Sequence, residues 1–195
     1  MTSGMASSAT PPSFRKALDE RISTLSRELD ALAGAHAAEA AGLARRELTL
    51  RLNQLVRRMR QADSAAGLAA TLLDAAGAFA GRAAIFRISK SAAVGESARG
   101  VSQDDAAAFQ SLEIALKDAP AIAAAVETLD PVVCARSPAE ISAELAALTE
   151  GGREDRVYLF PVAPRDAAAA LLCAWGKVDA PALEMLAQLA SAFWS

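Results

Sequence analysis

The stretch from Arg156 to Gly176 constrains the fold of this chain most, because it reads as two apolar segments joined by a turn. The first segment, RVYLFPV, is rich in β-branched and aromatic residues, and the second, AAAALLCAWG, is small and apolar throughout. Pro164, Arg165 and Asp166 between them are typical of a turn, because proline fixes φ and aspartate hydrogen-bonds to nearby backbone. This pattern predicts an antiparallel hairpin. Neither segment alternates between apolar and polar residues, so we expect a central strand pair covered on both faces.

The segment from Phe14 to Ala62 has the pattern of a long helix. Its first apolar residues follow the 4, 3, 4, 3 spacing of a coiled-coil seam: Leu18, Ile22, Leu25, Leu29 and Leu32. In the same register the seam next reaches His36, Glu39 and Leu43, and a second seam then begins in a shifted register: Leu48, Leu52, Leu55 and Met59. We therefore interpret Ala33 to Ala44, which contains Gly34 and Gly42, as a stutter, a loosened helix or a hinge.

The length of this helical segment predicts a partner. An unbroken helix over residues 14–62 would be roughly 75 Å long at 1.5 Å per residue. A domain of this size cannot bury such a helix, so we expect it to fold back or to pair. Three heptads favour a homodimer through the two seams. The sequence leaves open whether the two helices pair in parallel.

The remaining elements predict an α+β fold with a central antiparallel sheet flanked by helices. We divide the chain into a disordered tail (1–13), a dimerisation arm (14–62) and a domain (63–195) whose first helix begins near residue 48. Ser13 and Ser64 are candidate N-caps, and Gly81 is expected to end the helix after Ser64. The domain should then continue with a strand (83–88), its weaker partner (93–100), a short helix or loop (102–110), an edge strand (112–116), a helix (118–129), a strand (131–135), a helix from Ser137 to Gly151-Gly152, the hairpin and a last helix from Asp179. Terminal helices should cover one sheet face and inserted helices the other.

Composition and charge exclude several classes of protein. Ten basic and six acidic residues lie between Phe14 and Ala62, whereas ten basic and seventeen acidic residues follow, so a basic arm precedes an acidic domain. No segment resembles a signal peptide or approaches about 20 consecutive apolar residues, which predicts a cytoplasmic protein without membrane insertion. The basic cluster around Arg45 and Arg57 has no interleaved aromatic residues or recognised motif, so we expect no nucleic-acid binding.

From about Leu48 to Ser195 the chain resembles the GAF domain, a bacterial and eukaryotic sensory module. Two motifs carry the resemblance: LEIALKDAPAIAAAVETLDPVVCA, and the hairpin with the amphipathic helix after it. The resemblance implies a central sheet with a small-molecule pocket on one face. It also implies dimerisation through N-terminal helices and signal transduction to an output domain. No kinase, cyclase, phosphodiesterase or DNA-binding sequence follows the last helix, so we expect output to reach a separate protein partner.

Six residues are our candidates for contact with a small ligand. Arg87, Arg99 and Arg136 lie in or next to predicted strands and would give an anion-receptive pocket mouth; ion-paired surface is the alternative. Tyr158, Phe160 and Trp175 lie in the hairpin. Tyr158 and Trp175 would line a small apolar cavity, and packing in the core is the alternative.

Catalytic and metal chemistry find little support in the sequence. His36 is the only histidine and lies in the arm, while Cys134 and Cys173 lack metal-ligand spacing, so we expect no metal, no cofactor and no catalytic residue. The sequence therefore predicts a non-catalytic regulatory module. The first alternative is a scaffold or adaptor without a pocket. The second is a small-molecule reductase, which would need Cys134 and Cys173 to share one pocket as thiolates.

Overall fold

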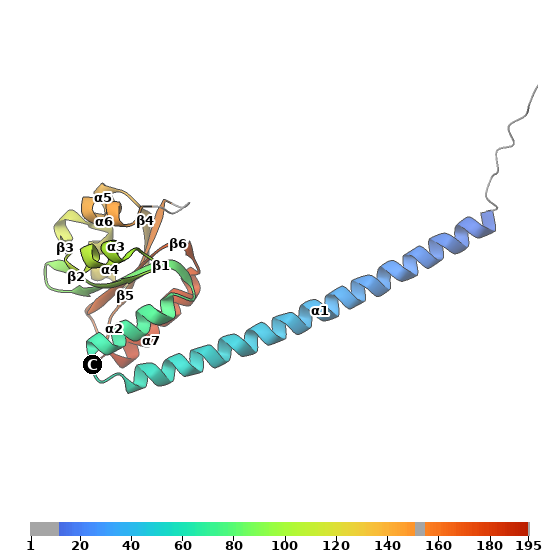
Figure 1. Ribbon diagram of the computed structural model, residues 1–195, viewed down its shortest axis with the longest axis horizontal. Helices are drawn as coiled ribbons and strands as arrows, with labels where there is room; N and C mark the ends of the chain where they lie inside the picture. Colours follow the sequence, from blue (N-terminus) through green and yellow to red (C-terminus); the bar gives the residue numbers. More distant parts are fainter. Residues whose placement is uncertain (1–11, 151–154, 195) are drawn as a thin grey trace, which may run out of the picture. The chain divides into compact units, whose positions relative to one another are not determined.

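The computed structural model describes residues 12–150 and 155–194 (Figure 1). The chain divides into two compact units, residues 1–52 and 53–195. Of the predicted tail, only Pro12 and Ser13 are described, and both are helical, so Ser13 is not an N-cap. The predicted helix stop at Gly151-Gly152 lies outside the described residues. The α+β fold class is confirmed.

Helix α1 (Pro12–Gln61) belongs to the first unit up to Leu52. Its last turns, from Asn53 on, belong to the second unit. The helix is unbroken, so of the three interpretations of Ala33 to Ala44 the hinge is wrong. Alanine has the highest helix propensity, and an isolated glycine costs only about 1 kcal/mol. The alanines around Gly34 and Gly42 therefore keep the segment helical.

The second unit alternates short helices and strands along the chain. Its elements after α1 are α2 (Ala65–Ala76), β1 (Ala80–Ile88), β2 (Ala92–Arg99), α3 (Gln103–Gln110), β3 (Glu113–Ala115), the 3₁₀ turn η1 (Leu116–Asp118), α4 (Pro120–Thr128), β4 (Val132–Ala135), α5 (Pro138–Ile141), α6 (Ala143–Leu148), β5 (Arg156–Val162), β6 (Ala170–Val178) and α7 (Ala180–Phe193). The sequence did not predict the turn η1 or the division between α5 and α6. Ser142 lies there at a φ of 78° and caps α6, because its Oγ accepts a hydrogen bond from the Leu145 N–H at 3.3 Å.

The six strands form one antiparallel sheet in the order β3-β2-β1-β6-β5-β4. The β5–β6 hairpin lies inside the sheet, with β1 on one side and β4 on the other, as predicted. Its connection is longer than the predicted turn, because the strand pairing ends at Val162 and Ala170. The intervening Ala163 N–H donates to Ser191 Oγ of α7 at 2.9 Å, which ties the connection to the last helix.

Helices cover both faces of the sheet, and Figure 1 shows α2 and α7 on one face and α3 to α6 on the other. This is the predicted layering. Ser64 caps α2 by accepting from the Gly67 N–H at 3.1 Å, and Asp179 caps α7 by accepting from the Ala182 N–H at 3.3 Å. Gly77, not Gly81, ends α2, and Gly81 lies within β1.

Candidate functional site

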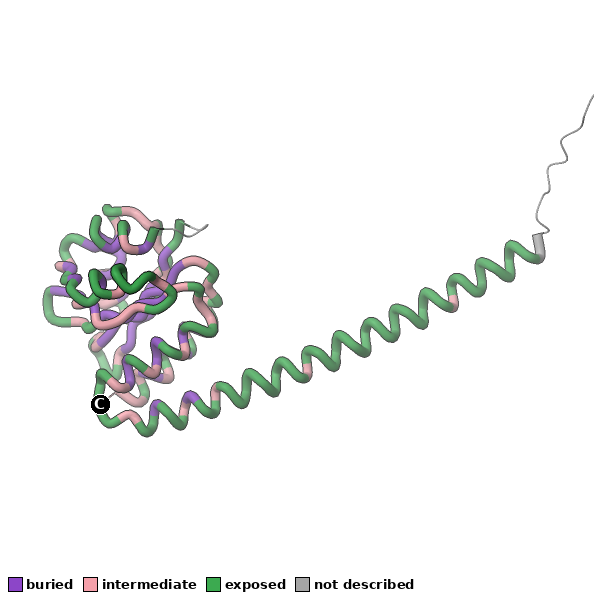
Figure 2. The backbone as a smooth tube through the Cα atoms, in the orientation of Figure 1, coloured by how far each residue is buried: buried purple, intermediate pink, exposed green. Residues whose placement is uncertain are grey.

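The face of the sheet under α3 to α6 is filled by side chains. Phe86 of β1 and Phe109 of α3 pack with their ring centroids 4.7 Å apart. A Cβ on Gly95 of β2 would lie 1.9 Å from the Phe109 carbonyl oxygen, so only glycine lets the end of α3 approach the sheet this closely. The other large buried side chains of this layer include Leu112, Ile114, Ile122, Ile141, Leu145, Leu159 and Trp175. Figure 2 shows, in purple, the buried positions along the strands.

Trp175 lies in this layer with its indole N–H buried. The residue is 1% exposed, and its indole Nε1 has no hydrogen-bond partner among the described residues. A buried donor without a partner costs about 1–3 kcal/mol. Within residues 12–150 and 155–194, the indole ring contributes to the core through its apolar packing.

The hairpin does not bring Tyr158, Phe160 and Trp175 together. Trp175 pairs with Val157 across the ladder, and Tyr158 pairs with Ala174. Successive residues of a strand point to opposite faces. Trp175 therefore lies under α3 to α6, whereas Tyr158 and Phe160 lie on the face of α2 and α7. The predicted shared cavity of Tyr158 and Trp175 is wrong because their positions differ by one residue in register.

Arg87 and Arg99 also lie away from the filled layer. Arg87 alternates with Phe86 on β1, and its Nε lies 3.3 Å from Glu96 Oε1. Arg99 forms an ion pair with Asp74 of α2. Both arginines are more than half exposed, and such surface pairs contribute about 0–1 kcal/mol each. These two match the ion-paired alternative and do not join Arg136 at a pocket mouth.

Arg136 is the predicted candidate that the structure places at a hollow. Its side chain is only 13% exposed, and it donates from Nη1 to the Thr149 carbonyl at 2.9 Å and from Nη2 to Asp155 Oδ1 at 2.6 Å. Arg82 of β1 donates from Nη1 to the Glu150 carbonyl at 2.6 Å. Two arginines thus bind the carbonyls that follow α6. Arg82 was not among the predicted site residues, although it shares the strand phase of Ala84 and Phe86.

The hollow beside Arg136 has a volume of about 570 Å³. Its lining combines small apolar side chains with one guanidinium and two carboxylates: Ala135, Arg136, Pro138, Ala143, Ala146, Ala147, Glu150 and Asp155. The guanidinium already pairs with Asp155, which is largely exposed. The guanidinium offers a contact for a small anion in place of the exposed Asp155 carboxylate, while Glu150 and Asp155 give the lining negative charge of its own.

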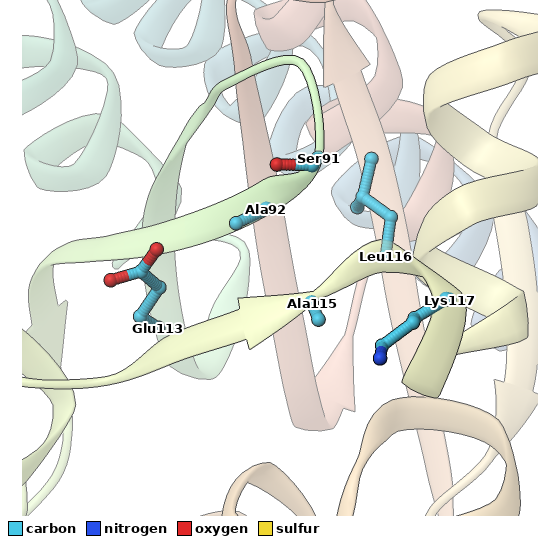
Figure 3. A pocket seen from close by; sticks show the side chains of 6 residues that line it. All are labelled: Ser91, Ala92, Glu113, Ala115, Leu116 and Lys117. Carbon is cyan, nitrogen blue, oxygen red and sulfur yellow. The ribbon is translucent and has the colours of Figure 1, made fainter.

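A second hollow, of about 670 Å³, lies at the β3 edge of the sheet (Figure 3). It is lined by Ser91, Ala92, Glu113, Ala115, Leu116 and Lys117. Figure 3 shows Glu113 and Lys117 near its two ends, on either side of the small Ala115. None of the six predicted ligand residues lies here. The hollow has little local signal in the sequence, because it depends on the pairing of Ala92 with Ala115, far apart in the chain.

The two cysteines lack the properties of reactive thiols. Burial, with a smaller contribution from the Glu140 carboxylate, raises the pKa of Cys134 to about 11. Complete burial likewise raises the pKa of Cys173. Both thiols are therefore protonated at neutral pH, whereas a nucleophilic cysteine needs a depressed pKa. Among residues 12–150 and 155–194, no three His, Cys, Asp or Glu side chains converge as metal ligands within one chain.

The predicted seam residues divide into two groups. Met59 is 1% exposed and Leu55 is buried within the second unit, so neither is available to a partner chain, and their assignment to the dimer seam is corrected. In the same turns Arg60 lies over the Phe193 ring of α7, 5.8 Å from its centroid. Leu48 stays exposed and Leu52 is half-buried. The large apolar residues that α1 leaves exposed on its other side form what we call the exposed stripe: Phe14, Leu18, Ile22, Leu25, Leu29, Leu32, Leu43 and Leu50.

The exposed stripe includes two residues that the sequence pattern did not place in a seam, Phe14 and Leu50. At about 100° per residue, its eight members lie within about 80° of one another around the helix. Leu43 and Leu50 thus continue the register of Leu18 to Leu32. Leu55 and Met59 lie roughly 100–140° from Leu18, on a different side of the helix.

None of the described helices is both long and apolar enough to span a membrane.

Comparisons with known proteins identify the fold. No family model and no curated protein matches the chain. Among solved structures, residues 122–287 of a methyl-accepting chemotaxis protein align with a TM-score of 0.56 at 14% identity, covering 73% of this chain and 94% of that one. The GAF domain of an Acinetobacter phosphoenolpyruvate-protein phosphotransferase gives 0.52 at 13% identity, with 75% and 92% covered. A GAF domain/HD domain protein of Geobacter sulfurreducens gives 0.52 at 10% identity, with 66% and 92% covered. The chain therefore contains a domain with the GAF-like fold, as its sequence motifs predicted.

Proposed function

We propose that this protein is a non-catalytic regulatory module of cytoplasmic, bacterial signal transduction that acts as a homodimer through α1. Two features support the proposal: the GAF-like fold of the second unit, and the pattern of exposed residues in the first. The module would pass its state to a separate protein partner. Binding of a small molecule in the second unit would bias the paired helices toward one arrangement.

The exposed stripe is the observation that carries this proposal. A typical solvent-exposed helix keeps its large apolar side chains on a covered face. Here Leu25 is 56% exposed, and the other members are comparable. Eight such side chains from each of two helices bury on the order of 1,600 Å², which is the usual size of a stable protein interface. A second copy of the stripe supplies the matching surface because coiled-coil seams are self-complementary.

Leu25→Asp tests the dimer. The substitution places two carboxylates in the middle of the apolar seam, and we expect the chain to become monomeric at micromolar concentration. Multi-angle light scattering on the full chain measures the mass. Ala31→Asp is the matched control, because position 31 is exposed and lies roughly 140° round the helix from Leu18. It should leave the dimer intact. An unchanged dimer mass for Leu25→Asp would refute the seam.

The hollow beside Arg136 is our candidate for the small-molecule site. The support is its largely buried guanidinium, whose only carboxylate partner among the described residues, Asp155, is mostly exposed. Of the six predicted ligand residues, Arg136 thus remains in the proposal as the anion contact. Thermal-shift screening of the full chain with nucleotides, amino acids and aromatic acids tests it. A compound that raises the melting temperature of the wild type should lose this effect in Arg136→Gln. It should keep the effect in Arg87→Gln, because the Arg87 side chain lies on the other face of the sheet.

A scaffold or adaptor without a ligand is the second candidate function. The filled layer under α3 to α6 favours it, because the face on which the resemblance places a pocket is occupied by side chains such as Phe86, Phe109 and Trp175. The scaffold would be supported if no compound in the screen changes the melting temperature while the chain still dimerises and captures a protein partner. A cysteine-based reductase has less support, since both thiols have raised pKa values.

A further inference from the structure

The exposed stripe contains a polar residue, His36, near its centre. His36 lies at the same angle around the helix as Leu18, to within about 10°, and every apolar member of the stripe lies within about 40° of it. The helix is continuous through this point, so His36 occupies an interior seam position between Leu32 and Leu43. It is the only histidine in the chain. A polar residue at such a position costs stability and usually specifies a pairing.

Glu39 lies one turn after His36, at the next seam position. Three residues along a helix rise about 4.5 Å, and side chains at this spacing are neighbours on the surface. Both residues are exposed, and neither side chain makes a hydrogen bond or ion pair with the described part of the chain. The four positions that flank this pair in the seam carry small residues: Ala33, Ala35, Ala40 and Gly42. Nothing bulky therefore separates the pair from the same pair of a second helix.

We propose that two copies of the chain bind one divalent transition-metal ion between their arms, with His36 and Glu39 of each copy as ligands. This inference rests on the proposed homodimer. It requires parallel, in-register pairing, because only then does each His36 face its own counterpart. In an antiparallel pairing over the full stripe, His36 instead lies opposite the segment from Leu25 to Leu32 of the other helix.

The ligand set suits zinc or a similar ion. Two imidazole nitrogens and two carboxylate oxygens complete a tetrahedral zinc site, with metal–ligand distances of about 2.0–2.2 Å. Glu39 supplies negative charge, so the ion offsets the repulsion that two facing carboxylates would otherwise cause in the seam. One chain alone offers only two ligands, which agrees with the lack of a metal cluster in the described part of a single chain. The metal thus links dimerisation to ion availability.

Zinc titration of the full chain tests the site. Sedimentation velocity with zinc or with a chelator gives the dimer dissociation constant, and calorimetry gives the stoichiometry. Zinc at about one hundred times its dissociation constant should tighten the dimer about one hundredfold. We expect one zinc per two chains. His36→Leu should keep or strengthen the dimer, because it completes the apolar stripe, and should lose the response to zinc. Glu39→Gln should weaken that response.

A matched control and the remaining outcomes test the metal site separately from the dimer. Glu20→Gln makes the same carboxylate-to-amide change on the opposite side of the helix, roughly 160° from Leu18, and should respond to zinc like the wild type. A dimer that is indifferent to zinc, binds one zinc per chain, or keeps its response in His36→Leu would overturn the metal site but leave the proposed function. A monomer under all conditions would overturn both.

Discussion

The arm and the domain treat their apolar residues in opposite ways. In the first unit, the members of the exposed stripe remain accessible, with Leu25 as an example. In the second unit, residues of the same type, such as Leu145 and Leu159, are fully buried between sheet and helices. The domain is complete by itself, because each sheet face has its own helices. Within the described part of the chain the arm has no such covering layer, and a helix draws most of its stability from packing against other elements.

Leucine-to-alanine changes in the two regions give the largest expected contrast. Leu145→Ala removes a 0% exposed side chain and should lower the free energy of unfolding of the domain by about 2–5 kcal/mol, from lost transfer energy and the cavity left behind. Leu25→Ala should leave the domain transition within about 0.5 kcal/mol and weaken only the dimer. Fluorescence of the buried Trp175 during urea unfolding reports on the domain. Equal effects of the two changes would contradict the independence of the two units.

Glycine-to-alanine changes extend the contrast to the backbone. Gly95→Ala adds a Cβ that would lie 1.9 Å from the Phe109 carbonyl oxygen, so α3 must shift. We expect a loss of about 1–3 kcal/mol, as for other overpacked cores. Gly34→Ala in α1 meets open space and should instead stabilise the helix by up to about 1 kcal/mol. Circular dichroism during thermal unfolding measures both. A neutral Gly95→Ala would show that α3 is not fixed against β2.

The sequence predicted elements whose signal is local. The hairpin, the layers and the caps at Ser64 and Asp179 follow from apolar runs, turn residues and capping side chains within a few positions. The division at Ser142 was missed, because a serine at positive φ has no distinct local pattern. The continuity of α1 was left open, because the alanine-rich segment interrupts the apolar seam while its backbone propensity favours a helix.

The candidate site was harder to predict because it depends on which face each strand residue takes. A register offset of one residue separates Tyr158 from Trp175, and hairpin pairing alone decides it. The acids that pair with Arg87 and Arg99 lie on other elements. Leu55 and Met59 have the spacing of a seam, yet the domain buries them. Periodicity shows that a helix face is apolar, but it does not show which neighbour covers that face.

The two cysteines give the smallest expected effect on stability. They compare a partly buried with a fully buried position within the domain. Cys134 is half-buried, whereas Cys173 is fully buried. The folded chain holds the Cys134 proton more tightly than the unfolded chain does, since burial raises its pKa from 9.0 to about 11. Its contribution to stability is therefore complete below about pH 9 and is lost as the pH rises toward 11.

Alkylation of the native protein measures this difference. Iodoacetamide should modify Cys134 slowly at pH 8 and faster as the pH approaches 11, because the thiolate is the reacting form. Cys173 should stay unmodified until the domain unfolds. Cys134→Ser should flatten the pH dependence of stability between pH 9 and 11 relative to the wild type. Rapid modification of Cys134 at neutral pH would show an activated thiol and would return the reductase alternative to consideration.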